Sequence, residues 1–198
     1  MPGKHEPRQK DPDPPQDAVV WSLSPSKGHA QGVVIESNKF VTARHYGTPV
    51  GCEVYVIRKD GTRFVTTVIS KATPDLQVTK AKLAKEPKLD RYWYGDIAVC
   101  VTREPFPVAP VEVMQFGSGK VTAMHKDGSF AVHSASLQNP NWLQAQANGK
   151  FAPGDSGLPW FFYKKAVRKW YVVGITSRSN TSVAESPRLG SKLFKPYL

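Results

Sequence analysis

The residues with the clearest chemical potential form a short turn, Gly154-Asp155-Ser156-Gly157, within the segment 151–160. A serine hydroxyl attacks a carbonyl carbon only when a base takes its proton and donors stabilise the oxyanion that forms. Glycine on both sides of the serine permits a tight turn that directs the N–H groups of Gly154 and Ser156 to one point beside the hydroxyl. Gly, Asp and Ser are also common in ordinary surface turns, so the rest of the chain must decide between the two interpretations.

A serine nucleophile needs a histidine base, and His45 is the best placed of the five histidines. It follows the apolar segment 40–43, which ends abruptly at His45-Tyr46-Gly47. A histidine at the end of a buried strand lies at the rim of a barrel, where it can face a cleft. The other histidines are expected in a leader segment or at the surface of polar hairpins: His5, His29, His125 and His133.

The histidine in turn needs a carboxylate that orients it, and two aspartates compete for this role. Asp96 opens the segment 96–102, which is apolar and alternating, and a charge at the start of a buried strand must be paired. Asp75 lies 75 − 45 = 30 residues after His45, but the segment that follows it is half polar. The sequence therefore favours Asp96 and leaves Asp75 as the alternative. Asp155 is expected to have a structural role beside the nucleophile.

Short apolar runs separated by turn residues must position these side chains, and no segment shows a helical stripe over three turns. Hairpin turns are expected at 59–61, 126–128 and 164–166, and a polar loop at 137–150. About six strands lie on each side of the proline-containing segment 102–110. The expected strands are 19–23, 32–35, 39–42, 53–58, 63–70, 76–83, 96–102, 111–116, 119–125, 129–136, 158–163 and 170–176.

This pattern predicts an all-β protein of two six-stranded antiparallel β-barrels with the site between them. Residues 18–104 would form the N-terminal barrel with the histidine and the aspartate. Residues 105–198 would form the C-terminal barrel with the serine. Residues 1–17 contain five prolines and no large aliphatic residue except Met1, which predicts a disordered leader.

Four blocks of the chain together resemble the signatures of chymotrypsin-like serine proteases of the PA clan. They are Val41-Thr42-Ala43-Arg44-His45, Asp96-Ile97-Ala98-Val99, Gly154-Asp155-Ser156-Gly157 and the segment 170–177, in the order that this family uses. In its size, its scarcity of cysteine and its lack of a signal peptide, the chain is similar to the compact proteases of positive-strand RNA viruses. Leu158 replaces the glycine usual in digestive members, and the cysteines that flank the histidine there are absent.

The resemblance implies a serine endopeptidase with His45, Asp96 and Ser156 as its triad and the amides of Gly154 and Ser156 as its oxyanion hole. It implies that Lys150 lies at the floor of the specificity pocket, where it would favour an acidic or polar residue before the cut. The wall of that pocket would be Thr176, Ser177, Arg178 and Ser179, whose backbone would pair with the substrate. The expected partner is a polypeptide, namely a viral polyprotein that includes the enzyme's own junctions, and the expected location is the host cytoplasm.

Two other functions compete with this expectation. One is a cellular trypsin-like protease. The other is a protease-fold module that also binds RNA, because the net charge is +11 and basic clusters at 80–88 and 164–169 lie near Trp93 and Trp170. A solvated basic surface explains the charge equally well.

The remaining expectations are a monomer, no membrane span and no cofactor or metal, because no clustered His/Cys/Asp spacing occurs. Cys52 and Cys100 are expected to be small buried residues with free thiols.

Overall fold

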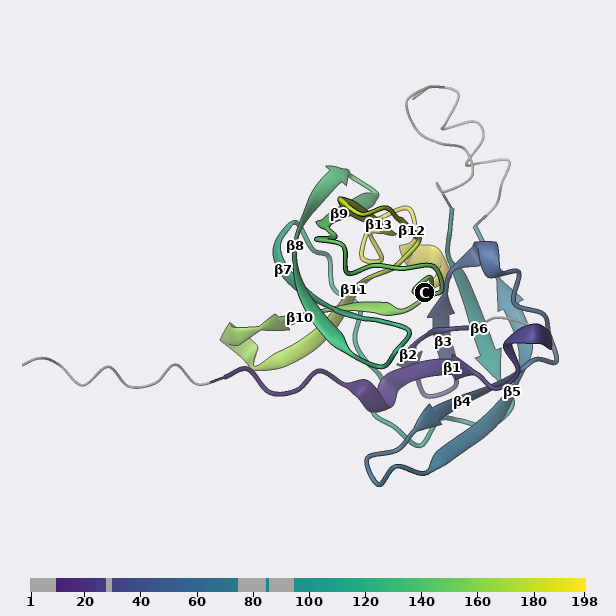
Figure 1. Cartoon of the computed structure of the whole chain (residues 1–198). Coiled ribbons are helices and arrows are strands. Elements are labelled where there is room, and N and C mark those ends of the chain that lie inside the picture. The colour runs from purple at the N-terminus through teal and green to yellow at the C-terminus, as the bar shows by residue number, and fades with distance from the viewer. Residues whose placement is uncertain (1–9, 28–29, 75–84, 86–94) are drawn as a thin grey trace, which may run out of the picture.

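The computed structural model describes residues 10–27, 30–74, 85 and 95–198. The all-β prediction is confirmed: the chain forms a closed six-stranded barrel followed by a seven-stranded sheet that makes a half-barrel (Figure 1). In Figure 1 the first barrel runs from purple to teal and the second sheet from green to yellow.

The first barrel has the strand order β1-β2-β3-β6-β5-β4, and its neighbouring strands are antiparallel. Buried and less buried residues alternate along β4, whereas three successive residues are buried on each of β2, β3 and β6, so both faces of these strands are covered. The pairing of β3 with β6 sets Thr42 opposite Ala98. The strand bounds are β1 Val19–Ser22, β2 Gly32–Glu36, β3 Lys39–Thr42, β4 Glu53–Ile57, β5 Arg63–Ala72 and β6 Ala98–Thr102.

The second sheet has the order β11-β10-β7-β8-β9-β13-β12 and is also antiparallel. It has seven strands where about six were expected, because β9, β12 and β13 were not foreseen and the expected strand 111–116 does not form. The predicted turns at 59–61, 126–128 and 164–166 connect successive strands as expected. The strand bounds are β7 Ser118–Met124, β8 Phe130–Asn139, β9 Trp142–Gln146, β10 Pro159–Lys164, β11 Lys169–Ile175, β12 Arg178–Ser179 and β13 Val183–Pro187.

Three strand assignments in the second half were wrong. The segment 137–150 was expected to be a polar loop, but β8 extends into it and it contains β9. Its polar residues face outward while Leu143 and Ala145 are buried. Its many glutamine and asparagine residues made the alternation of apolar and polar residues hard to recognise in the sequence. The segment 111–116 was expected to be a strand, yet it makes only the isolated bridge of Val113 to Val172. The strands β12 and β13 were not foreseen. The predicted strand 76–83 lies outside the described residues.

Part of the predicted leader is among the described residues. Residues 10–17 are described, and Gln16–Ala18 form a 3-10 turn that leads into β1. Residues 13–17 line a groove of about 930 Å³ together with Trp21, Met124 and Trp170. Ala18, which directly precedes β1, is fully buried. The disordered leader over residues 1–17 stays a prediction.

The two halves share one hydrophobic core. A cluster of buried side chains extends from Phe40 and Val41 of the first barrel to Leu158, Phe161 and Ile175 of the second sheet. A smaller cluster around Trp160 and Leu143 fills the second sheet. The serine turn directly precedes Leu158, so the shared core fixes its position relative to the first barrel.

Both cysteines are free and buried, as predicted. Burial raises the pKa of Cys100 to about 12 and also raises that of Cys52, so neither thiol is a reactive thiolate at neutral pH. In the part of the chain that the structure describes, no helix is long and apolar enough to cross a membrane.

We expect Phe40→Ala to destabilise the whole protein. Phe40 is fully buried and packs edge-on against Phe106, with ring centroids 6.2 Å apart, so truncation leaves a cavity costing about 3–5 kcal/mol. Val65→Ala on β5, where the side chain is 40% exposed, should cost less than about 1 kcal/mol. Urea unfolding of both variants measures this difference, and equal midpoints would contradict the position of the core.

Candidate active site

His45 and Asp96 are held together by the pairing of two strands of the first barrel. His45 lies in the 3-10 turn Arg44–Tyr46 directly after β3, and Asp96 lies just before β6. The backbone N–H and the Nδ1 of His45 each lie 2.8 Å from the carboxylate of Asp96, at Oδ1 and Oδ2. The structure brings His45 and Asp96 together, and the alternative Asp75 lies outside the described residues.

The hydrogen bond to Asp96 determines which ring nitrogen of His45 is available for chemistry. A carboxylate accepts, so Nδ1 must carry a proton, and the neutral ring therefore has its lone pair on Nε2. The His45 side chain is 18% exposed while that of Asp96 is 1% exposed. The His45 ring is thus partly exposed, whereas the carboxylate of Asp96 that holds it is buried.

A residue of the second half completes the surroundings of Asp96. Ser177, which follows β11, donates a hydrogen bond from its Oγ to Oδ2 of Asp96. The same residue accepts a hydrogen bond, through its backbone carbonyl, from Oγ of Ser156 at 3.4 Å. A chain of hydrogen-bonded residues therefore runs from His45 through Asp96 and Ser177 to Ser156.

The turn around Ser156 has the backbone conformation that the sequence predicted. Gly154 and Gly157 have φ angles of 96° and 82°, which residues with a Cβ rarely adopt. Gly157 donates its N–H to the carbonyl of Thr176 at 2.8 Å. Ser156 itself is half-buried, and Gly154 is exposed.

The amides of Gly154 and Ser156 were predicted to bind an oxyanion. Among the described residues, neither of these N–H groups has a hydrogen-bond acceptor. Their carbonyls, in contrast, both accept from Nε2 of Gln31, at 2.8 Å and 3.2 Å. The turn is therefore held by its carbonyls, and its two amides remain available as donors.

Gln31 and Tyr46 are two residues of the site that the sequence did not identify. The Tyr46 hydroxyl makes a hydrogen bond with the Ser156 side chain and accepts a 3.4 Å hydrogen bond from Gln31. Burial raises the pKa of Tyr46 to about 12, and the charges of Asp155 and Asp96 add to this effect. Its proximity to His45 in sequence was the only available signal, and Gln31 offered none.

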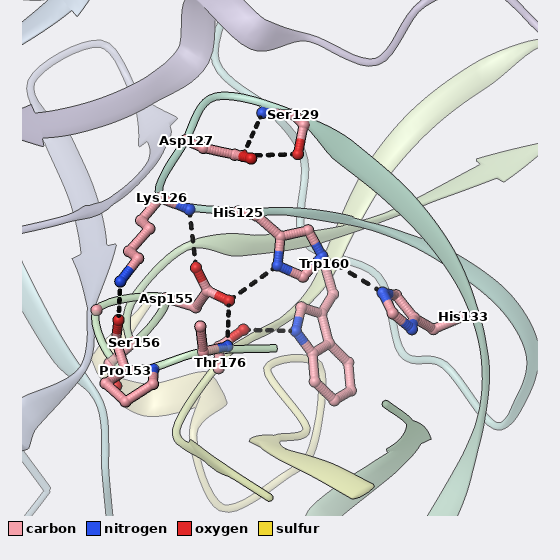
Figure 2. Close-up of polar contacts among 12 residues, drawn as sticks. His125, Lys126, Asp127, Ser129, His133, Pro153, Asp155, Ser156, Trp160 and Thr176 are labelled. Carbon is pink, nitrogen blue, oxygen red and sulfur yellow. Dashed lines mark hydrogen bonds and ion pairs between the residues drawn. The ribbon is translucent and has the colours of Figure 1, made fainter. Parts of the chain in front are cut away.

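Asp155 is a buried anchor on the inner side of the turn, as expected (Figure 2). Its carboxylate accepts hydrogen bonds from Nδ1 of His125 and from the backbone N–H groups of Lys126 and Ala152, at 2.8–2.9 Å. Burial alone would raise the pKa of Asp155, but these hydrogen bonds outweigh it and hold the pKa below its ordinary value. Lys126 also reaches the carbonyl of Pro153 with its Nζ at 2.6 Å.

The prediction that His125 and His133 are surface residues was wrong. They are 6% and 1% exposed, and their rings lie beside each other and beside Phe151 (Figure 2). His125 directly follows β7 and His133 lies on β8, opposite Val121, so both rings face the inside of the second sheet. The polar hairpin between them hid this burial in the sequence.

The residues predicted to bind substrate fall into two groups. Thr176 and Ser177 are buried, and Thr176 accepts the indole N–H of Trp160 at 2.9 Å. Arg178 and Ser179 form β12, which pairs with β13 on one side only and so ends the sheet. Arg178 makes an ion pair with Glu185 of β13.

Lys150 lies in the exposed loop after β9, where its N–H donates to the carbonyl of Ala147. The basic residues 164, 165, 168 and 169 lie at the exposed tip between β10 and β11, and Lys169 pairs with Glu112. Of the other basic cluster, only Lys85 is among the described residues.

The site thus brings His45, Asp96 and Ser177 into one network with Ser156, at the boundary of the two halves. In this arrangement Nε2 of His45 can accept a proton. The amides of Gly154 and Ser156, in the same turn as the Ser156 hydroxyl, can act as hydrogen-bond donors. A comparison with models of known protein families and a search of curated proteins found no match to this chain.

We expect Gly157→Ala to damage the serine turn far more than its backbone conformation alone requires. A Cβ at Gly157 would lie 2.2 Å from the carbonyl oxygen of Gln31. Gly61 has a similar φ of 85° but nothing within 4 Å of such a Cβ, so Gly61→Ala measures the conformational cost alone. That cost is about 1–2 kcal/mol, and the clash adds about 1–3 kcal/mol. Urea denaturation would refute this expectation if both variants lost the same stability.

Proposed function

We propose that this chain is a serine endopeptidase that cleaves peptide bonds through an acyl-enzyme. His45 takes the proton of Ser156 at Nε2 as the hydroxyl attacks the scissile carbonyl. Asp96 holds the ring with Nδ1 protonated and stabilises the imidazolium that forms. His45 then donates this proton to the leaving amine, and a water molecule hydrolyses the acyl-enzyme in the reverse sequence.

Three other features support the individual steps of this mechanism. Ser177 fixes Asp96 through its hydroxyl and lies against Ser156 through its carbonyl. The unpaired amides of Gly154 and Ser156 are suited to an oxyanion, and losing one such donor costs about 3–4 kcal/mol in other enzymes. In the part of the chain that the structure describes, β12 is the last strand of its sheet, and an extended substrate would add beside it as a further strand.

The observation that carries the proposal is the hydrogen-bonded sequence from His45 through Asp96 and Ser177 to Ser156. It joins residues 81 positions apart, from both halves of the chain.

We further propose that the substrate is a viral polyprotein, including the enzyme's own junctions, in the host cytoplasm. This rests on the resemblance to compact viral proteases, as does the proposed preference for an acidic or polar residue before the cut. Lys150 is exposed in the loop after β9 and is the residue assigned to that preference.

The direct test is hydrolysis of a peptide library together with labelling by a fluorophosphonate. The wild-type chain should cleave a defined subset of peptides and react at Ser156. Ser156→Ala should lose both activities, and His45→Ala should lose nearly all hydrolysis, because each removes a group that exchanges the reacting proton. Circular dichroism should show both variants folded. Hydrolysis retained by purified Ser156→Ala would overturn the assignment.

A second prediction separates the two candidate carboxylates. Asp96→Asn should lower kcat by several orders of magnitude, about 10⁴-fold in the best-studied triad, because an amide no longer holds Nδ1 protonated. Asp75→Asn is the matched control and should leave kcat nearly unchanged. Steady-state kinetics on one peptide compares them, and the opposite ranking would make Asp75 the orienting residue.

A further inference from the structure

A second group of titratable side chains lies behind the serine turn and has no part in the mechanism above. His125 directly follows β7, His133 lies on β8 and Asp155 belongs to the turn, and all three are buried (Figure 2). The Phe151 ring lies against both imidazoles, with centroids 4.8 Å and 4.6 Å away. The cluster is therefore largely shielded from water. The protonation state of each side chain depends on its hydrogen bonds to the other residues of the cluster and to the backbone.

The hydrogen bonds determine how many protons the cluster holds. Nδ1 of His125 lies 2.8 Å from the Asp155 carboxylate, and Nδ1 of His133 lies 2.8 Å from the carbonyl of Gln146. Both acceptors require a proton on the nitrogen that faces them. The two Nε2 atoms face each other at 3.4 Å. Two lone pairs or two N–H groups would repel there, so one additional proton lies between the rings and one histidine is an imidazolium.

The surroundings place this proton on His125. Burial lowers the pKa of His133, and the nearby charges of His125 and Lys150 lower it further, against the opposing effect of the Gln146 carbonyl. His125, in contrast, lies directly against a carboxylate. The other charged groups around the pair belong to the hairpin and the loop: Lys126, Asp127 and Lys150. His125 is therefore the cation and His133 the neutral acceptor.

This charge pair lies next to the atoms that would bind the oxyanion. Asp155 separates Gly154 from Ser156 in the chain, and the imidazolium compensates its buried charge. The same carboxylate accepts from the backbone of Lys126 and Ala152, so it joins the hairpin after β7 to the serine turn. Loss of the positive charge would leave the buried Asp155 carboxylate hydrogen-bonded but without a compensating charge, and this would loosen the turn.

We propose that His125 is a positioning residue, the protonated member of a buried histidine pair whose ion pair with Asp155 holds the oxyanion turn in its binding geometry. His133 keeps the proton on His125 by accepting its Nε2–H. The effect on catalysis rests on the proposed peptidase function, whereas the protonation and the geometry of the turn do not.

Nitrogen-15 NMR of the histidine rings in the full-length protein at neutral pH tests the protonation directly. His125 should show both ring nitrogens protonated, and His133 should show the neutral form with Nδ1 protonated. Assignments come from the single variants His125→Gln and His133→Gln. A neutral His125 in the wild-type protein would overturn the proposal, whatever its activity.

The two glutamine variants then test the positioning role. Glutamine at 133 can donate to the Gln146 carbonyl and accept from His125, so it reproduces the neutral ring, whereas glutamine at 125 supplies no charge to Asp155. We expect the amide signals of residues 154–157 to shift or broaden in His125→Gln and to stay close to wild type in His133→Gln. Unchanged turn signals in a folded His125→Gln protein would overturn the proposal even if the protein had no peptidase activity.

Steady-state kinetics adds the catalytic consequence. His125→Gln should lower kcat by up to roughly 10²-fold with little change in KM, because oxyanion stabilisation acts mainly in the transition state. His133→Gln should retain most of kcat. A wild-type kcat in His125→Gln, with peptidase activity established, would overturn the positioning role while leaving the proposed function intact.

Discussion

The structure of the candidate site depends on one buried carboxylate, that of Asp96. It belongs to the first barrel, yet one of its three hydrogen-bond donors, Ser177, comes from the second half. A carboxylate that is 1% exposed is stable as an anion only when its lone pairs accept hydrogen bonds. The two halves must therefore pack so that Ser177 reaches Asp96. The position of His45 relative to Ser156 follows from this requirement, because each is bonded to a member of the same network.

The contact between the halves explains two residues that have no chemical role of their own. Gly157 lies so close to the Gln31 carbonyl that no side chain fits there, and the Gln31 amide in turn holds the carbonyls of Gly154 and Ser156. The first barrel thus contributes part of the scaffold of the nucleophile turn.

The sequence predicted the parts of this structure that depend on local chemistry. The barrel strands, the hairpin turns and the pairing of His45 with Asp96 follow from alternation, turn residues and an unpaired charge at a strand start. It failed where long-range packing decides. The alternation of β9 was obscured by glutamines that face outward, and β13 exists because it pairs with β9.

The same limit applies to the site. Gln31 is 125 residues from Ser156, and no local pattern indicates that they touch. His125 and His133 flank a polar hairpin, a position typical of surface residues, and only the closure of the second sheet buries them. Residues that act through tertiary contacts leave no periodicity or motif in the sequence, whereas glycine turns and strand ends do.

Among the described residues, two His–Asp pairs have the same Nδ1-to-carboxylate distance of 2.8 Å, and their surroundings suit them to opposite proposed roles. His45 has a partly exposed ring, so its Nε2 can exchange a proton with a bound substrate. His125 has its Nε2 against a second buried imidazole, so its proton has no route to substrate or solvent. A base must change charge in every catalytic cycle, whereas a turn that binds an oxyanion must keep its charge fixed while that happens. Burial, rather than residue type, separates the two functions in this fold.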